Sequence, residues 1–173
     1  MPHRVLLMTT SERADLLESL TAQRGFLLYT VAGLTDDQAR LRTTVSELTL
    51  GGLIKHVART EKGWTDFIID GPSSMEMTED CYAEHADGFV LREDETLAGV
   101  VADYEKIAQR TDELVRTLPD LGASHPLPAA PWFRPGAQRS ARRVFVHVVG
   151  ETAQHAGHAD ILREAIDGQK TMA

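Results

Sequence analysis

LAGVVADYEKIAQRTDELVRTL, residues 97–118, decides the fold class, because its apolar side chains recur at the three- and four-residue spacing of an amphipathic helix. The recurring positions are Leu97, Val100, Val101, Tyr104, Ile107, Ala108, Thr111, Leu114, Val115 and Leu118. Three further stretches have a helical period, about Thr10 to Val31, Thr49 to Ile69 and Ser140 to Asp167, and none alternates convincingly as a strand. We therefore predict an all-α four-helix bundle with long crossover loops, forming a single domain over residues 1–173.

Several residues predict where these helices begin and end. Thr9-Thr10-Ser11-Glu12 forms a capping-box pattern before the first helix, and Thr49 is a suitable N-cap for the second. Gly71-Pro72 should end the second helix, and Gly168 suits the left-handed position after the fourth. The boundaries therefore agree with the apolar period.

The connections between the predicted helices differ in length. Residues 33–49 have room for a helical turn, whereas residues 71–93 and 120–137 are long and rich in Gly, Pro, Ser and acidic residues. Loops of this length are uncommon unless they have a function. The second one carries Trp132 and Phe133, whose rings we expect to pack across one end of the bundle.

Charge and composition restrict the partners. The chain has 18 basic and 26 acidic residues, a net charge of −8, and no basic run beyond Arg139, Arg142 and Arg143. Nucleic acid and anionic membranes require a basic surface, so neither is expected as a main partner. Cys81 is the only cysteine, which rules out an internal disulfide. With no apolar run long enough for a signal peptide or a membrane span, we expect a cytoplasmic protein.

The fourth helix directs polar side chains toward the core. On a helical wheel, Glu151 and His155 fall inside the apolar stripe, while His147 and His158 lie on its flank. The stripe itself consists of Val144, Val148, Leu162 and Ile166. A buried carboxylate is almost always paired, so Glu151 requires a partner such as His155, an arginine or a metal ion.

His56 faces the core from the second helix. It shares that face with Trp64, which we expect to be a core residue, whereas Lys55, Arg59, Lys62 and Asp66 fall on a face expected to be solvated. A lone core histidine usually donates to or accepts from a hydroxyl or a backbone carbonyl. Two helices that both present ligand-type side chains to the interior favour a metal site.

Spacing restricts which residues of the fourth helix can share an ion. His147 and His155 are eight residues apart, about 12 Å along a helix, which is too far for one ion. The pair is therefore either His147 with Glu151 or Glu151 with His155, because side chains four residues apart can converge. The apolar stripe favours the second pair.

Two motifs together resemble the DinB-like superfamily of metal-binding four-helix bundles. They are LTLGGLIKHVARTEKGW (48–64) and HVVGETAQHAGHADILREAIDG (147–168). The resemblance is closest to an actinobacterial branch thought to contain mycothiol-dependent transferases, and ERADLLESLTAQRGFLLYTVAGLTDDQ (12–38) resembles the first helix of that branch. It therefore covers nearly the whole chain.

The resemblance implies a metal bound by one histidine of the second helix and a residue-x3-His pair of the last. His56, Glu151 and His155 stand at these positions. Many DinB-like proteins have H-x3-H followed by R-G-Q, whereas Ala156-Gly157-His158 follows here. Glutamate at the first position is also the pattern of mycothiol-dependent maleylpyruvate isomerase. The resemblance also implies that homodimers are common, although no apolar stripe identifies an interface.

Two histidines and a carboxylate leave a fourth zinc position for water or substrate; nickel, iron and manganese suit the same ligands. A divalent ion can deprotonate a coordinated thiol. Because Cys81 lies in a loop-like stretch, the thiol should come from outside the chain. The family resemblance implies a small thiol such as mycothiol, which would attack an electrophilic small molecule. His147 or His158 could orient a ligand or accept a proton.

Two alternatives to a thiol-dependent enzyme remain open. They are a non-catalytic metal-binding module and a hydrolase that uses metal-bound water.

Overall fold

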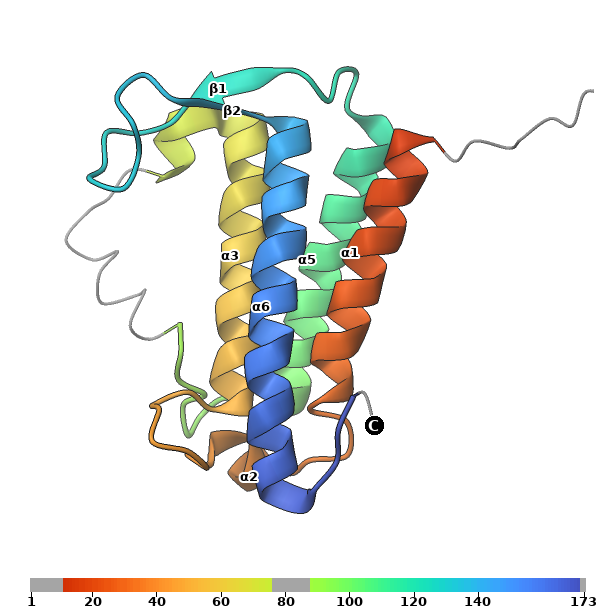
Figure 1. Ribbon diagram of the computed structural model, residues 1–173, viewed down its shortest axis with the longest axis vertical. Helices are drawn as coiled ribbons and strands as arrows, with labels where there is room; N and C mark the ends of the chain where they lie inside the picture. The colour runs from red at the N-terminus through yellow and green to blue at the C-terminus, as the bar shows by residue number, and fades with distance from the viewer. Residues whose placement is uncertain (1–10, 76–87, 172–173) are drawn as a thin grey trace, which may run out of the picture.

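Four long helices pack side by side in the computed structural model, which describes residues 11–75 and 88–171 (Figure 1). They are α1 (Glu12–Tyr29), α3 (Leu50–Asp70), α5 (Leu97–Thr117) and α6 (Ala141–Asp167). The shorter elements are α2 (Asp36–Arg40), the 3-10 helix η1 (Gly71–Met75) and the strands β1 (Ser124–Pro126) and β2 (Gln138–Ser140). The predicted all-α bundle is confirmed, and α2 supplies the helical turn expected after the first helix.

The helix ends follow the local sequence. Ser11, Thr49 and Ser140 are N-caps, and their hydroxyl oxygens accept hydrogen bonds from the backbone N–H three residues on. Each such bond satisfies a donor that has no partner within its helix. At the C-terminal end of α6, Gly168 has a φ of 80°, a conformation that glycine adopts without steric cost.

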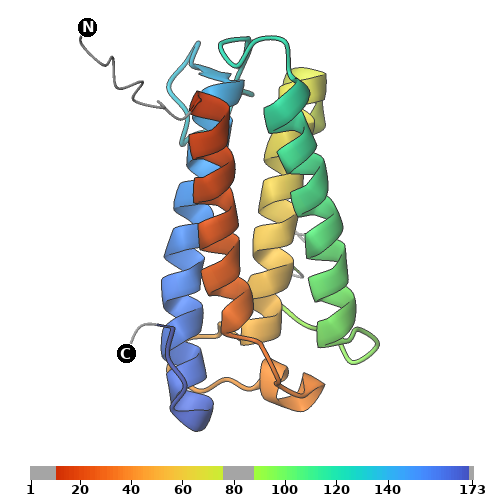
Figure 2. The same cartoon turned by 90° about the vertical axis from the view of Figure 1, so that its right-hand side faces the viewer.

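The helices run in two parallel pairs. In both views, α1 and α6 run in one direction and α3 and α5 in the other (Figures 1 and 2). The connection from α3 to α5 therefore passes from one end of the bundle to the other, whereas the other two connections join helices at the same end. Since α3 and α6 are antiparallel neighbours, the middle of one faces the middle of the other.

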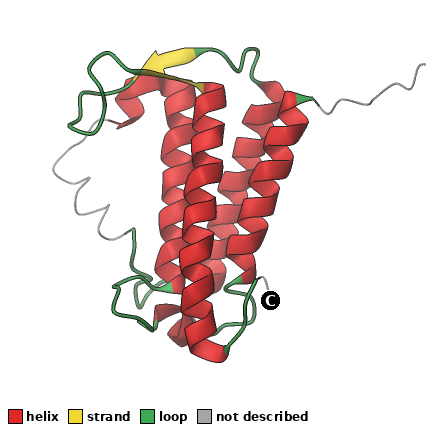
Figure 3. Cartoon of the chain, viewed as in Figure 1, coloured by secondary structure: helices red, strands yellow, loops and turns green. Residues whose placement is uncertain are grey.

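A short hairpin closes one end of the bundle, as Figure 3 shows in yellow. β1 and β2 pair antiparallel, with Ser124 opposite Ser140. The sequence did not predict these strands, because three residues are too few to display an alternating pattern. In the loop between them Phe133 packs against the core, but Trp132 is 65% exposed. The expectation that both rings pack is therefore correct only for Phe133.

The described core residues form two apolar clusters separated by a buried polar layer. Along α1, Arg24 lies between Leu20 of one cluster and Leu27 of the other. Along α3, Glu61 likewise lies between residues of these two clusters. Arg24 donates to Glu61 and to Asp112 of α5, with nitrogen–oxygen distances of 2.5 and 2.7 Å. The middle of the bundle therefore accommodates charge when the charge is paired.

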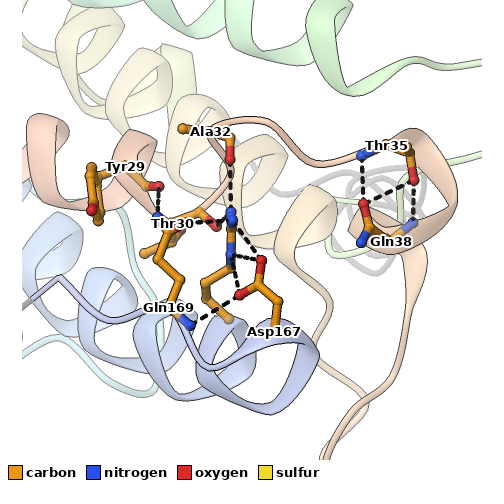
Figure 4. A network of polar contacts seen from close by, with 8 residues as sticks. Tyr29, Thr30, Ala32, Thr35, Gln38, Asp167 and Gln169 are labelled. Atoms are coloured by element: carbon orange, nitrogen blue, oxygen red, sulfur yellow. Dashed lines mark hydrogen bonds and ion pairs between the residues drawn. The ribbon is translucent and has the colours of Figure 1, made fainter.

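Another buried arginine joins the end of α1 to α6. Arg163 donates to the carbonyls of Thr30 and Ala32, both at 2.9 Å, and pairs with Asp167. Figure 4 shows these contacts beside the capping box that Thr35 and Gln38 form at the start of α2. Carbonyl groups just beyond the C-terminal end of α1 thereby gain partners that the helix cannot provide.

Among the described helices, none is long and apolar enough to cross a membrane.

Candidate metal centre

Two antiparallel helices bring three ligand-type side chains together. His56 comes from α3, and Glu151 and His155 from α6; one donor atom of each lies within 4.8 Å of the other two. The rings of His56 and His155 meet edge to face, with centroids 4.7 Å apart. The two helices thus assemble the same three residues that helical spacing and the family resemblance select.

Glu151 lies between two imidazoles of its own helix. Its Oε2 is 3.7 Å from Nε2 of His155, and its Oε1 is 3.6 Å from Nε2 of His147. The Glu151 side chain is 31% exposed and that of His155 is 12% exposed. The centre therefore lies in a partly buried position that small molecules could reach, rather than in the dry core that the helical wheel suggested for Glu151.

The three side chains fit a divalent ion in chemistry and in spacing. Bonds of about 2.0–2.2 Å place two ligand atoms of one ion at most about 4.4 Å apart. A small rotation of the side chains would therefore bring all three donor atoms within bonding distance of one ion. Nδ1 of His155 is also buried without a hydrogen-bond partner among the described residues, although its Nε2 faces Glu151. Two nitrogens and one carboxylate oxygen are a donor set that suits zinc, nickel, iron or manganese.

Burial sets the protonation of the site histidines. It lowers the pKa of His155 below the usual 6.5, against the opposing effect of Glu151. Burial also lowers the pKa of His147, and the charge of Arg139 lowers it further. Both imidazoles are therefore neutral at neutral pH, which is the form that binds a metal or accepts a proton.

A Gly-Gly pair lets a loop cover His56. The ring of Phe89 stacks on His56 with centroids 3.9 Å apart and planes at 19°. A Cβ on Gly52 would lie only 1.9 Å from the Phe89 carbonyl oxygen, and one on Gly51 would lie 2.7 Å from Leu91. Phe89 was not predicted as part of the site, although two consecutive glycines at a helix start are a signal of close backbone approach.

The same loop corrects the prediction for Lys55, which was placed on a solvated face. Lys55 is only 6% exposed, and its ammonium donates to the Val90 carbonyl at 3.0 Å and to Glu95 at 2.7 Å. The helical wheel could not show this burial, because the covering residues belong to a distant part of the chain. Lys55 and the glycines together fix the loop on α3.

The remaining candidates lie on either side of the three ligand-type residues. The His158 ring is 5.5 Å from that of His155, and its Nδ1 is buried without a hydrogen-bond partner among the described residues. His147 is outside the group of three but contacts Trp64 edge to face, with centroids 4.8 Å apart. Trp64 is buried, as expected. Cys81 lies outside the described residues.

One side chain near the site was not anticipated. The guanidinium carbon of Arg139 lies 4.3 Å from the centroid of the Trp64 ring. In the sequence, Arg139 is distinguished only as part of a short basic run. Its position over the tryptophan depends on the β hairpin, which the sequence did not predict.

Comparisons with known proteins agree with this architecture. A crystal structure of a conserved protein from Enterococcus faecalis superposes with a TM-score of 0.64 at 16% identity, covering 93% of this chain and 100% of that chain. At this identity the likeness shows the fold alone. A search of curated proteins gives no match. The family model described as Mycothiol-S-transferase matches residues 15–168, and the chain therefore belongs to the mycothiol-S-transferase family.

Proposed function

We propose that the protein is a metal-dependent S-transferase that joins a low-molecular-weight thiol of the mycothiol type to an electrophilic carbon of a second small molecule. The observation that carries this proposal is the convergence of His56, Glu151 and His155 within 4.8 Å, in a chain of the mycothiol-S-transferase family. In this proposal the three side chains hold a divalent ion, with zinc as the first choice. When bound, such an ion supplies Lewis acidity that favours the thiolate form of a thiol beside it.

His147 is suited to accept the proton of the thiol. Its imidazole is neutral, because burial and Arg139 lower its pKa, and its Nε2 faces the Glu151 carboxylate at 3.6 Å. The S–H proton passes to His147, the sulfur electron pair forms the S–C bond, and the leaving group departs with the electron pair of the broken bond. Glu151 is close enough to stabilise the resulting imidazolium.

His158 has a positioning role in this proposal. Its ring contacts that of His155 rather than Glu151, so it lies on the other side of the centre from His147. Packing against His155 restricts the rotation of that imidazole and keeps Nε2 directed at Glu151.

A thermal-shift experiment with metal and thiol tests the proposal. We expect mycothiol to raise the melting temperature of zinc-loaded protein and to have little effect on chelator-treated protein or on His56→Ala, because binding to the native state is stabilising. His125→Gln is the matched control, since His125 lies in β1 and contacts Ile68 rather than the metal centre.

The outcomes separate the alternatives. If zinc raises the melting temperature but mycothiol does not, the transferase proposal is wrong and a metal-binding module remains. If zinc-loaded protein cleaves an activated ester without any thiol, and His56→Ala does not, the hydrolase is favoured instead.

A further inference from the structure

Arg139 has an unusual environment. It lies on β2, two residues before α6 begins, and its guanidinium stacks over Trp64 with Phe133 5.6 Å away. Its Nη1 atom is buried, yet it has no hydrogen-bond partner among the described residues. Leaving a buried charged donor without an acceptor is costly, so such a group in a folded protein calls for an explanation.

No carboxylate among the described residues accepts a hydrogen bond from Nη1 of Arg139. Glu151 attracts Arg139 electrostatically, but the two do not form an ion pair among the contacts of the described residues. Arg143, one turn further along, adds a second positive charge near both Arg139 and His147. In a chain with a net charge of −8, this pair of arginines is a local excess of positive charge beside the candidate metal centre.

Side-chain contacts connect Arg139 to the metal centre through Trp64. The Trp64 ring touches Arg139 and His147, and His147 faces Glu151 at 3.6 Å. Arg139 therefore lies on the His147 side of the centre, which is also the side of the proposed proton acceptor. Anything bound to Arg139 would be close to the atoms that react.

A half-open, mostly apolar pocket lies beside this position. The loop between the strands borders about 510 Å³, and its wall includes Leu127, Ala130, Pro131 and the charged side chain of Arg134. Phe133 belongs both to this wall and to the stack around Arg139. A molecule with an apolar body and an anionic group could place the body in the pocket and the anion on the guanidinium of Arg139, whose buried Nη1 has no hydrogen-bond partner among the described residues.

We propose that Arg139 is a substrate-specificity residue that binds a carboxylate of the electrophilic substrate, whose apolar part occupies the loop pocket. A guanidinium can make two parallel hydrogen bonds to a carboxylate, which fixes orientation as well as charge. Arg143 contributes longer-range attraction. The identification of the ligand as the electrophile rests on the proposed function. The presence of a carboxylate site at Arg139 does not.

Fluorescence of Trp64 gives a direct test. The chain has two tryptophans, so Trp132→Phe leaves Trp64 as the only one, directly beneath Arg139. The probes are 4-phenylbutyrate and its neutral amide. We expect 4-phenylbutyrate to change the fluorescence saturably. The affinity for the amide should be lower by about tenfold or more, as for the loss of a charged hydrogen bond.

Variants assign the effect to Arg139. In the Trp132→Phe protein, Arg139→Gln should weaken 4-phenylbutyrate binding by about tenfold or more, and Arg139→Lys should retain part of the affinity. Arg116→Gln is the control, because Arg116 is an exposed arginine of α5. Equal binding of acid and amide, unchanged affinity in Arg139→Gln, or no saturable signal would each overturn the proposal.

Two further measurements separate this proposal from the proposed function. His56→Ala and chelator-treated protein should still bind 4-phenylbutyrate, so the carboxylate site can be confirmed even if no thiol binds. Binding that disappears in His56→Ala but persists in Arg139→Gln would place the carboxylate at the metal and contradict the assignment. Displacement of 4-phenylbutyrate by mycothiol would contradict the assignment to the electrophile.

Discussion

The backbone of Phe89 lies directly on Gly52, so that a Cβ at Gly52 would come within 1.9 Å of the Phe89 carbonyl oxygen. Gly52 is in the first turn of α3, one turn before His56, whose ring stacks on that of Phe89. Glycine is unfavourable in a helix, and the close approach explains why it is present here. The contact fixes the position of the ring that covers one candidate ligand.

Gly52→Ala should therefore displace Phe89 and destabilise the protein by about 1–3 kcal/mol, as expected for overpacking. Gly63→Ala in the same helix is the matched control, because a Cβ there meets nothing within 4 Å. It should be neutral or stabilise by up to about 1 kcal/mol, because alanine is the better helix former. Urea unfolding of both variants measures the difference, and equal stabilities would show that Phe89 does not pack on Gly52.

The buried ion pair of Arg24 with Glu61 predicts a larger effect. Arg24→Met should cost about 3–5 kcal/mol of unfolding free energy, because it leaves the fully buried Glu61 carboxylate without its partner. Lys62→Met removes an exposed pair with Asp66 and should cost at most about 1 kcal/mol. Denaturant unfolding of the two variants tests this, and similar losses would contradict the buried pair.

The Arg24→Met/Glu61→Met double variant gives a second check. Because it removes both buried charges, it should lose less stability than the sum of the two single variants. Simple additivity in the double-mutant cycle would show that the two side chains do not interact.

The histidine pKa values predict a pH dependence for the metal-free protein. His147 and His155 have folded-state pKa values below 6.5, so below about pH 6.5 the unfolded chain binds more protons than the folded one. The unfolding free energy should fall as the pH decreases through that range. Chelator-treated protein, unfolded in urea at several pH values, tests this expectation.

Replacement of the histidines identifies the source of that pH dependence. His147→Gln and His155→Gln should each flatten the decline, because glutamine does not titrate. His125→Gln serves as the control. A decline of unchanged slope in both site variants would show that these two imidazoles are not responsible.

Much of the fold was predictable because it depends on local sequence. The 3,4 spacing located all four long helices, and Thr49 and Gly168 mark ends where capping chemistry required them. The first helix differs from the capping box expected over Thr9 to Glu12, because Ser11 is the N-cap and its hydroxyl accepts from the N–H of Ala14. The geometry of the last helix also favoured Glu151 with His155 over Glu151 with His147, and the structure groups the first pair with His56.

The remaining features depend on contacts between distant segments. Lys55 was predicted to be solvated because its own helix cannot reveal that Val90 and Glu95 cover it. Phe89 and Arg139 were missed as neighbours of the site for the same reason. Their positions are set by a loop and a hairpin that have no periodic pattern. Side-chain burial from such segments cannot be inferred from a single helix.

The metal content of the purified protein and its variants tests the central claim most directly. We predict one divalent ion per chain, with affinity reduced more than about tenfold in His56→Ala, Glu151→Ala and His155→Ala while circular dichroism remains helical. The His125→Gln control should keep its ion. Equal metal content in all four variants and the parent protein, or no stoichiometric binding of any divalent ion to the parent, would contradict the account.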